Sequence, residues 1–250
     1  MTLKILQLNI WNGGKLWGNL EAFLKDNSFD ILFFQEVFNG HGQVPNRYKT
    51  LELFKDMFPG YYSHFAPSFG DIGEYGAIDR GNAIFSKFPI TSSDIIFFDL
   101  PYRVFEEQKQ RDFEQTPRAL EYCEVDLGKT RVNLFNHHGI WGHHGDDTPR
   151  RLEMGKTIVR HIRNKENVIL AGDFNLNPDT ETVRMVEKEL ESVFSNTLPS
   201  TFNMKRKDDP GYATAKVDML FVSKNIKVLE KDCPQVDVSD HFPLTAVLEV

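Results

Sequence analysis

Residues 30–38, DILFFQEVF, form a near-continuous apolar run that ends in the polar pair Gln35-Glu36. Such a run is typical of a strand that is buried on both faces of a sheet. Residues 167–175, NVILAGDFN, repeat the arrangement, with an apolar run that ends at Asp173 and Asn175. Because a sheet must cover its apolar faces with helices or with another sheet, these stretches indicate an α/β fold.

The rest of the chain alternates strand-like and helix-like segments. Apolar spacing predicts helices at 16–27, 47–58, 150–165 and about 179–190, the third capped by Asp147 or Thr148 ahead of Pro149. Strands are predicted at 2–10, 61–66, 81–86, 91–99, 217–223, 226–232 and 243–250, with a hairpin of 119–127 and 130–137. The charged stretch 102–118 and residues 199–215 are predicted to be loops. Without a linker or an internal repeat, residues 1–250 are predicted to form one domain.

Composition narrows the class of protein. A net charge of −7, with 40% hydrophobic and 26% charged residues, describes an ordinary globular chain and disfavours a duplex-binding protein with a basic face. Two cysteines are too few for a disulfide framework and fit a reducing compartment. The first residues lack a signal-peptide cleavage site, and no apolar run is long enough to cross a membrane. We therefore expect a soluble cytoplasmic protein without stable membrane association.

Polar side chains gather where the predicted strands begin or end. They are Asn9, Gln35, Glu36, Asn136, His138, Asp173, Asn175, Asp218, Ser239, Asp240 and His241. Strand ends are where open α/β sheets bind ligands, and a buried carboxylate is costly unless it is paired or bound to a cation. Carboxylate and amide oxygens suit Mg²⁺ or Mn²⁺, and histidines beside such an ion can stabilise a phosphoryl oxyanion. The set therefore indicates metal-assisted hydrolysis of a phosphate ester.

Seven blocks, LNIW, LFFQEV, GNAIFSKFPI, LFNHHG, LAGDFNLNP, KVDMLFVS and SDHFPL, occur in this order between Asn9 and Leu244. In order and spacing the chain resembles the endonuclease/exonuclease/phosphatase superfamily, which includes deoxyribonuclease I and exonuclease III-type enzymes. The resemblance implies a deoxyribonuclease I-like, four-layer α/β sandwich, in which two packed mixed β-sheets are flanked by helices. It also implies divalent-metal-dependent hydrolysis of phosphate esters.

The resemblance further assigns a metal site. It implies that Glu36 is the principal ligand of Mg²⁺ or Mn²⁺, that Asn9 lies beside it, and that Asp240 belongs to the metal side or to a second-metal position. One or two ions are both compatible with the sequence.

The catalytic positions come from the same resemblance. Asp173 aligns or deprotonates the attacking water, and Asn175 holds the phosphate or that aspartate. His241 contacts a phosphate oxygen and is oriented by Asp218, an arrangement that favours the imidazolium. His138 takes the family's histidine position, where it bonds a phosphate oxygen or the leaving group.

The stretch 136–147, NHHGIWGHHGDD, contains half of the chain's eight histidines. Alternation along a strand turns His137 to the face opposite His138. For the loop that follows, two interpretations remain open: His143 and His144 are solvated, or the loop lines the substrate cleft. Adjacent histidine pairs rarely converge on a tetrahedral ion, which disfavours a separate zinc site.

Four residues are candidates for binding substrate. Arg80 and Arg118 precede family-like strands and can bind a phosphate oxygen, although a solvated arginine is an equal alternative. Trp141 and His143 are candidates at the rim, where Trp141 can stack on a base or sugar or simply pack.

The resulting hypothesis is a phosphodiesterase of the nuclease or nucleotide-end-processing kind that uses in-line attack of an activated water. Its partner is a phosphate ester, for which single-stranded nucleic acid or a nucleotide fits an acidic protein. The alternatives are a phospholipid, sphingomyelin or inositol-phosphate phosphohydrolase and, in another class, a non-catalytic binding module on the same fold. A monomer is expected from the family.

Overall fold

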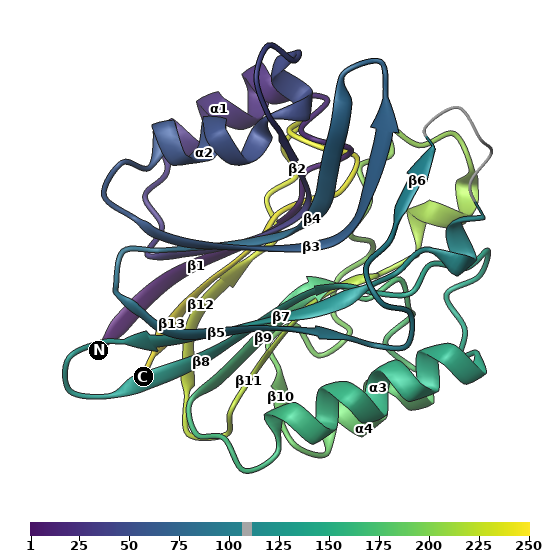
Figure 1. Cartoon of the computed structure of the whole chain (residues 1–250). Helices are drawn as coiled ribbons and strands as arrows, with labels where there is room; N and C mark the ends of the chain where they lie inside the picture. Colours follow the sequence, from purple (N-terminus) through teal and green to yellow (C-terminus); the bar gives the residue numbers. More distant parts are fainter. Residues whose placement is uncertain (107–111) are drawn as a thin grey trace.

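The computed structural model describes residues 1–106 and 112–250. Within these residues, two mixed β-sheets pack face to face and helices cover their outer faces (Figure 1). The first sheet has the order β12-β13-β1-β2-β4-β3-β6 and the second β10-β11-β9-β8-β7-β5. Helices α1 (Trp17–Asp26) and α2 (Thr50–Met57) lie on the first sheet, and α3 (Pro149–Ile162) and α4 (Glu181–Glu187) on the second. The predicted four-layer α/β sandwich is confirmed.

The strands have the following bounds. In the first sheet they are β1 (Thr2–Asn9), β2 (Ile31–Gly40), β3 (Tyr62–Gly73), β4 (Gly76–Ser86), β6 (Val104–Glu106), β12 (Lys227–Asp232) and β13 (Leu244–Glu249). In the second they are β5 (Ile90–Phe97), β7 (Ala119–Asp126), β8 (Arg131–His138), β9 (Val168–Asp173), β10 (Glu191–Ser192) and β11 (Asp218–Val222). The pairs β1·β2, β8·β9 and β3·β6 are parallel, and the other pairs are antiparallel.

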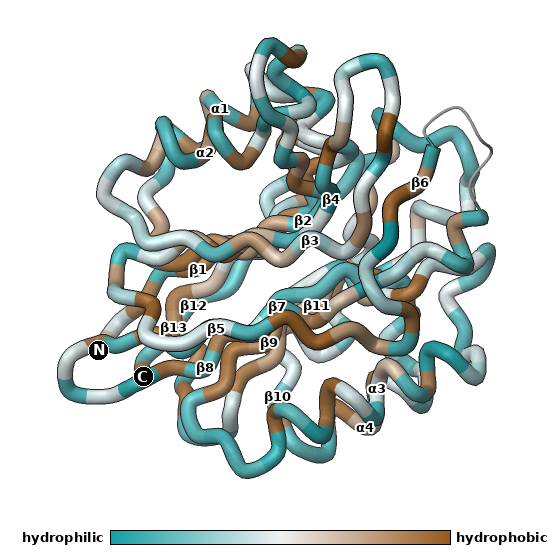
Figure 2. Tube along the Cα trace, in the orientation of Figure 1, coloured by the Kyte–Doolittle hydropathy of each residue, from teal (hydrophilic) through white to brown (hydrophobic). Residues whose placement is uncertain are grey.

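Side-chain alternation builds three apolar layers from these strands. Figure 2 shows hydrophobic residues along the packed strands. In β1, Leu3 and Ile5 enter the core between the sheets, whereas Leu6 and Leu8 pack under α1 and α2. In β9, Ile169 enters the same central core, and Leu170 packs under α3 and α4. Both sheets are thus covered on two sides, as the near-continuous apolar runs predict.

Several elements differ from the predictions. The strands expected at 61–66 and 81–86 extend into a long β3–β4 hairpin that closes at Gly73 and Gly76. In its outer part Phe69 and Ile78 are buried, whereas Ile72 is exposed. Part of the expected loop 102–118 is instead strand β6, which pairs with β3, while residues 107–111 lie outside the described residues. Among described residues, every helix is too short or too polar to span a bilayer.

Capping of the last two helices was only partly anticipated. The Thr148 side chain accepts from the backbone N–H of Arg151 and caps α3. The Asp147 carboxylate instead reaches the start of α4, where it accepts from the backbone N–H groups of Glu181 and Thr182. Asp147 thereby ties the loop after β8 to the helix that follows β9.

Candidate active site

The same alternation that builds the central core carries a polar cluster to one end of it. Gln7 and Asn9 continue the inward face of Leu3 and Ile5 in β1, and Asp173 continues the inward face of Ile169 and Ala171 in β9. Gln35, Asn136, His138 and Asp218 follow the same rule in β2, β8 and β11. Adjacent strands end at the same rim, so side chains distant in sequence converge there.

Glu36 reaches this rim through a β-bulge. Strict alternation would turn Glu36 toward α2, but the register of β2 on β4 shifts between Phe34 and Val37. Glu36 takes a positive φ of 61°. Its Oε1 then accepts from Asn9 Nδ2 at 3.1 Å, and its Oε2 accepts a short bond from the backbone N–H of Asn12. The left-handed backbone at Glu36 is therefore part of what aims the carboxylate, as often happens at functional sites.

Asp173 is at the centre of the cluster. Its Oδ2 lies 3.0 Å from Asn9 Nδ2, 3.5 Å from His138 Nε2 and 3.9 Å from His241 Nε2. Its Oδ1 accepts from the backbone N–H of Asn175 at 2.9 Å. Burial raises the pKa of Asp173 to about 6, against the lowering effect of His241. A carboxylate with such a pKa is ionised at neutral pH and is still basic enough to take a proton.

His241 and Asp218 form a buried ion pair. His241 Nδ1 lies 2.8 Å from Asp218 Oδ2. Burial by itself would lower the pKa of His241, but the charge and hydrogen bond of Asp218, with Asp240 and Asp173, raise it to about 10. The ring is therefore an imidazolium at neutral pH, with Nε2–H directed to the centre of the site.

His138 differs from His241 in its charge state, because its ring is neutral. Burial, the neighbouring Arg118 and then His241 lower its pKa well below the ordinary value, so the ring is neutral. Arg118 NH1 approaches His138 Nδ1 at 3.4 Å. Since a guanidinium only donates, Nδ1 is the acceptor and the proton resides on Nε2, which faces Asp173. The site therefore combines one charged and one neutral imidazole around one carboxylate.

Asn175 and Asp240 complete the set of predicted residues. Asn175 has a φ of 54°, and its Nδ2 donates to the Gly139 carbonyl at 3.0 Å, which joins the ends of β8 and β9. Asp240 Oδ1 lies 3.9 Å from His241 Nε2. Asp240 Oδ2 is paired at 2.6 Å with Lys207, a residue that sequence reasoning missed. In the sequence Lys207 is marked only by its place in a loop rich in charged residues. Its pairing with Asp240 depends on how residues 199–215 fold back onto the rim.

The four candidate substrate-binding residues separate into three places. Arg118 is buried beside His138, inside the cluster. Arg80 forms a salt bridge with Asp71 and stacks 4.3 Å from the Phe38 ring, away from the histidines. Trp141 and His143 lie on the loop after β8 with their rings 4.9 Å apart, and His143 is exposed. The structure thus brings Arg118 next to His138, whereas the contacts described for Arg80, Trp141 and His143 are with other residues.

The donor atoms at the rim suit a hard divalent cation. Glu36, Asp240 and Asp173 offer carboxylate oxygens, which Mg²⁺ and Mn²⁺ prefer. Asp173, Asp218 and His241 also lie close enough to share an ion, but Asp218 Oδ1 and Oδ2 are already held by Gln7 and His241. Both oxygens of Glu36 likewise accept hydrogen bonds, from Asn9 and from the backbone N–H of Asn12, so each of these carboxylates could contribute to holding an ion. Asn9 Nδ2 donates to both Glu36 and Asp173, and its Oδ1 accepts from the backbone N–H of Trp11 at 3.0 Å; a half-turn of the amide would give up these bonds to present Oδ1 to an ion.

A buried chain of amides leads away from this rim between the sheets. Gln7 Nε2 donates to Asp218 Oδ1 at 3.0 Å and to Gln35 Oε1 at 2.9 Å, and Gln35 donates to Asn136 Oδ1 at 2.7 Å. Asn136 in turn donates to Glu121 Oε2 at 2.9 Å. Gln7 and Glu121 were missed from the sequence, although a polar residue at an inward position of a buried strand is itself a signal.

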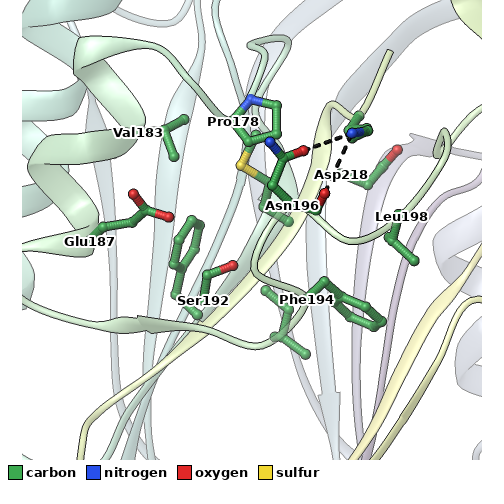
Figure 3. A pocket seen from close by; sticks show the side chains of 12 residues that line it. Pro178, Val183, Glu187, Ser192, Phe194, Asn196, Leu198 and Asp218 are labelled. Carbon is green, nitrogen blue, oxygen red and sulfur yellow. Dashed lines mark hydrogen bonds between the residues drawn. The ribbon is translucent and has the colours of Figure 1, made fainter. Parts of the chain in front are cut away.

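A pocket lies along β10 and β11 at the edge of the second sheet and reaches Asp218 (Figure 3). Glu187 of α4, Ser192 of β10 and Phe194 line it, and Lys216 donates to Asn196 Oδ1 at 2.8 Å across one end. Of the catalytic candidates it reaches Asp218 alone, whose two oxygens are held by Gln7 and His241. The chemistry-bearing groups therefore belong to the rim and not to this pocket.

The chain belongs to the endonuclease/exonuclease/phosphatase family, whose sequence pattern matches residues 6–241. Proteins of this family are generally hydrolases of phosphate esters and are typically dependent on divalent metals. No curated protein matches the chain.

Solved structures share the fold. A Bacteroides vulgatus endonuclease/exonuclease/phosphatase has 18% identity and a TM-score of 0.74 over 100% of this chain and 99% of its own. A Bacteroides thetaiotaomicron mannosyl-6-phosphatase has 21% identity and a TM-score of 0.72 over 99% of this chain and 100% of its own. D. rerio TDP2, complexed with a single-strand DNA product, has 16% identity and a TM-score of 0.72 over 100% and 99%. At such identities these similarities show the fold alone.

Proposed function

We propose that this protein is a divalent-metal-dependent phosphodiesterase that hydrolyses its substrate by in-line attack of an activated water. The observation that carries the proposal is the position of Asp173 Oδ2, within 3.9 Å of His138 Nε2, of His241 Nε2 and of the Asn9 amide. A basic carboxylate surrounded by two N–H donors is suited to take a proton from water while the donors hold phosphoryl oxygens.

Glu36, Asp240 and the turned amide of Asn9 would hold Mg²⁺ or Mn²⁺. When bound, the ion neutralises phosphoryl charge and promotes ionisation of water. Asp173 accepts the proton of the attacking water as the new P–O bond forms and the ester P–O bond breaks. Asn175 keeps Asp173 Oδ1 in place through its backbone N–H.

The two histidines take different parts. His241, held charged by Asp218, donates Nε2–H to a phosphoryl oxygen and offsets the negative charge that develops there. His138 donates its Nε2–H to a second oxygen or to the leaving group, while Arg118 sets its tautomer through Nδ1. The departing alkoxide leaves with a proton, so the products are an alcohol and a phosphate monoester.

For the substrate class, we propose single-stranded nucleic acid or a nucleotide, handled as in end processing. Trp141 and His143 present aromatic rings on the loop that follows His138, where a base can stack. The likeness to TDP2, complexed with a single-strand DNA product, is consistent with this class. The mannosyl-6-phosphatase likeness favours a small phosphomonoester as the second candidate. We further propose that residues 1–250 act as one domain and as a monomer in a reducing, cytoplasmic compartment.

The test is product release from a substrate panel in Mg²⁺ or Mn²⁺ against EDTA. The panel contains bis-p-nitrophenyl phosphate, single- and double-stranded DNA, RNA, sphingomyelin, and inositol and sugar phosphates. Wild type is compared with Asp173→Asn and with Asp94→Asn, an exposed carboxylate on β5 as the matched control. We expect metal-dependent cleavage that Asp173→Asn lowers about 10³-fold and Asp94→Asn leaves unchanged. A folded Asp173→Asn protein with wild-type turnover would rule out the proposed mechanism.

A further inference from the structure

Lys207 pairs with Asp240, the carboxylate that the family resemblance assigns to the metal side or to a second-metal position. Its Nζ lies 2.6 Å from Asp240 Oδ2, and the two side chains are only 21% and 4% exposed. The rings of Phe202 and Tyr212 flank the ammonium at 5.0 and 4.8 Å. A lysine held between a buried carboxylate and two aromatic faces is fixed in place and differs from a solvated surface lysine.

The loop that carries Lys207 is anchored to the strand-end segment that carries the site. The Asn203 backbone N–H donates to the Asp240 carbonyl at 2.9 Å, and Asn203 Nδ2 donates to the Ser239 carbonyl at 3.0 Å. Arg206 forms a salt bridge with Asp237 at 2.5 Å. The ammonium is therefore positioned by the fold and needs no substrate to order it.

Lys207 brings a positive charge directly to Asp240. A lysine ammonium is protonated at neutral pH, and the Asp240 carboxylate pairs with it. A divalent ion on Asp240 Oδ2 would compete with the ammonium for that oxygen and would be repelled by its positive charge.

We propose that Lys207 replaces a second metal ion, so that the site binds a single divalent cation on the Glu36 side. Asp240 then offers only Oδ1 to that ion. The ammonium has three N–H donors, and those that Asp240 does not use can contact a phosphoryl oxygen. This inference rests on the proposed function and makes it more specific, because it sets the number of ions and adds a phosphate-binding group.

The test counts bound Mn²⁺ by electron paramagnetic resonance in wild type, Lys207→Met, Lys207→Arg and Lys205→Met. Lys205 is an exposed lysine of the same loop and serves as the matched control. We expect one ion per chain in wild type, Lys207→Arg and Lys205→Met, and two in Lys207→Met, where Asp240 Oδ2 is released. Thermal unfolding checks that each variant is folded.

The count separates the two proposals. Two ions on wild type, or one on folded Lys207→Met, would overturn the inference and leave the hydrolase intact. A wild-type chain that binds no Mn²⁺ would overturn both. In turnover at Mn²⁺ levels that fill one site, Lys207→Met should lose about 10²-fold in kcat and Lys207→Arg should recover part of it. An unchanged kcat would remove the phosphate-binding role.

Discussion

His137 and His138 are neighbours in one strand with different environments. His138 faces the site, whereas His137 is fully buried on the other face of β8, with its ring 5.9 Å from Phe98 and 4.2 Å from Phe174. Among the described residues neither nitrogen of His137 has a hydrogen-bond partner. Burial lowers the pKa of His137 to about 3, so the folded protein holds it neutral.

This buried imidazole should make stability depend on pH. Between pH 6.5 and 3 the unfolded chain binds a proton that the folded chain does not, so His137 lowers the free energy of unfolding as pH falls. Above 6.5 both states are neutral and the effect disappears. At pH 5 the cost is about 2 kcal/mol, at ~1.4 kcal/mol per unit. Urea unfolding at pH 7 and 5 should show a smaller loss in His137→Leu than in wild type; equal losses would contradict this.

At the scale of elements, strand register decides the chemistry. The bulge in β2 directs Glu36 to the rim. The parallel pairing of β8 and β9 brings Asn175 to the Gly139 carbonyl, to which its side chain donates a hydrogen bond. The amide chain through Gln7, Gln35 and Asn136 crosses from one sheet to the other. Two sheets that pack through apolar contacts alone can slide, and a row of directed hydrogen bonds restricts the sliding.

Gln7 is expected to be a positioning residue for Asp218. It holds Asp218 Oδ1, so that Oδ2 points to His241, and the buried amide does not reach the rim. Gln7→Met keeps the volume but leaves Asp218 Oδ1 and Gln35 Oε1 without this donor, at a cost of about 1–3 kcal/mol in stability. We expect kcat to fall about tenfold with KM nearly unchanged.

The comparison variant is Gln7→Glu, which keeps the shape and, once protonated, one donor. It should recover part of the lost kcat relative to Gln7→Met. Equal kcat in wild type and folded Gln7→Met would show that the amide only packs. Steady-state kinetics and urea unfolding on the same preparations separate the two roles.

At the scale of the whole molecule, charge constrains the substrate. The chain carries a net −7, so attraction of a polyanion must come from a few local cations such as Arg118 and Lys207. Each phosphate contact releases a counterion, which makes affinity for single strands fall with salt. For a site with two such contacts, we expect a plot of log(kcat/KM) against log salt concentration to have a slope of about −1.4, at roughly −0.7 per contact.

Measurement of kcat/KM for single-stranded DNA between low and physiological salt tests this prediction. A dinucleotide substrate, with a single internal phosphate, is the control and should give a shallower slope. A flat response for both would argue against nucleic acid and favour a small phosphate ester.

By itself the sequence determined the layers and most of the rim, because both depend on local alternation. Alternate residues of a strand point to the same face, so the alternation that directs Ile169 and Ala171 into the core also directs Asp173 inward. The end of each buried apolar run therefore shows where the polar residues will lie. Only the tertiary structure decided the bulge at Glu36, the tautomer that Arg118 imposes on His138, and the approach of Lys207 to Asp240. These features depend on pairing between segments far apart in the chain, whose geometry is set when two sheets pack and a loop folds over their edge.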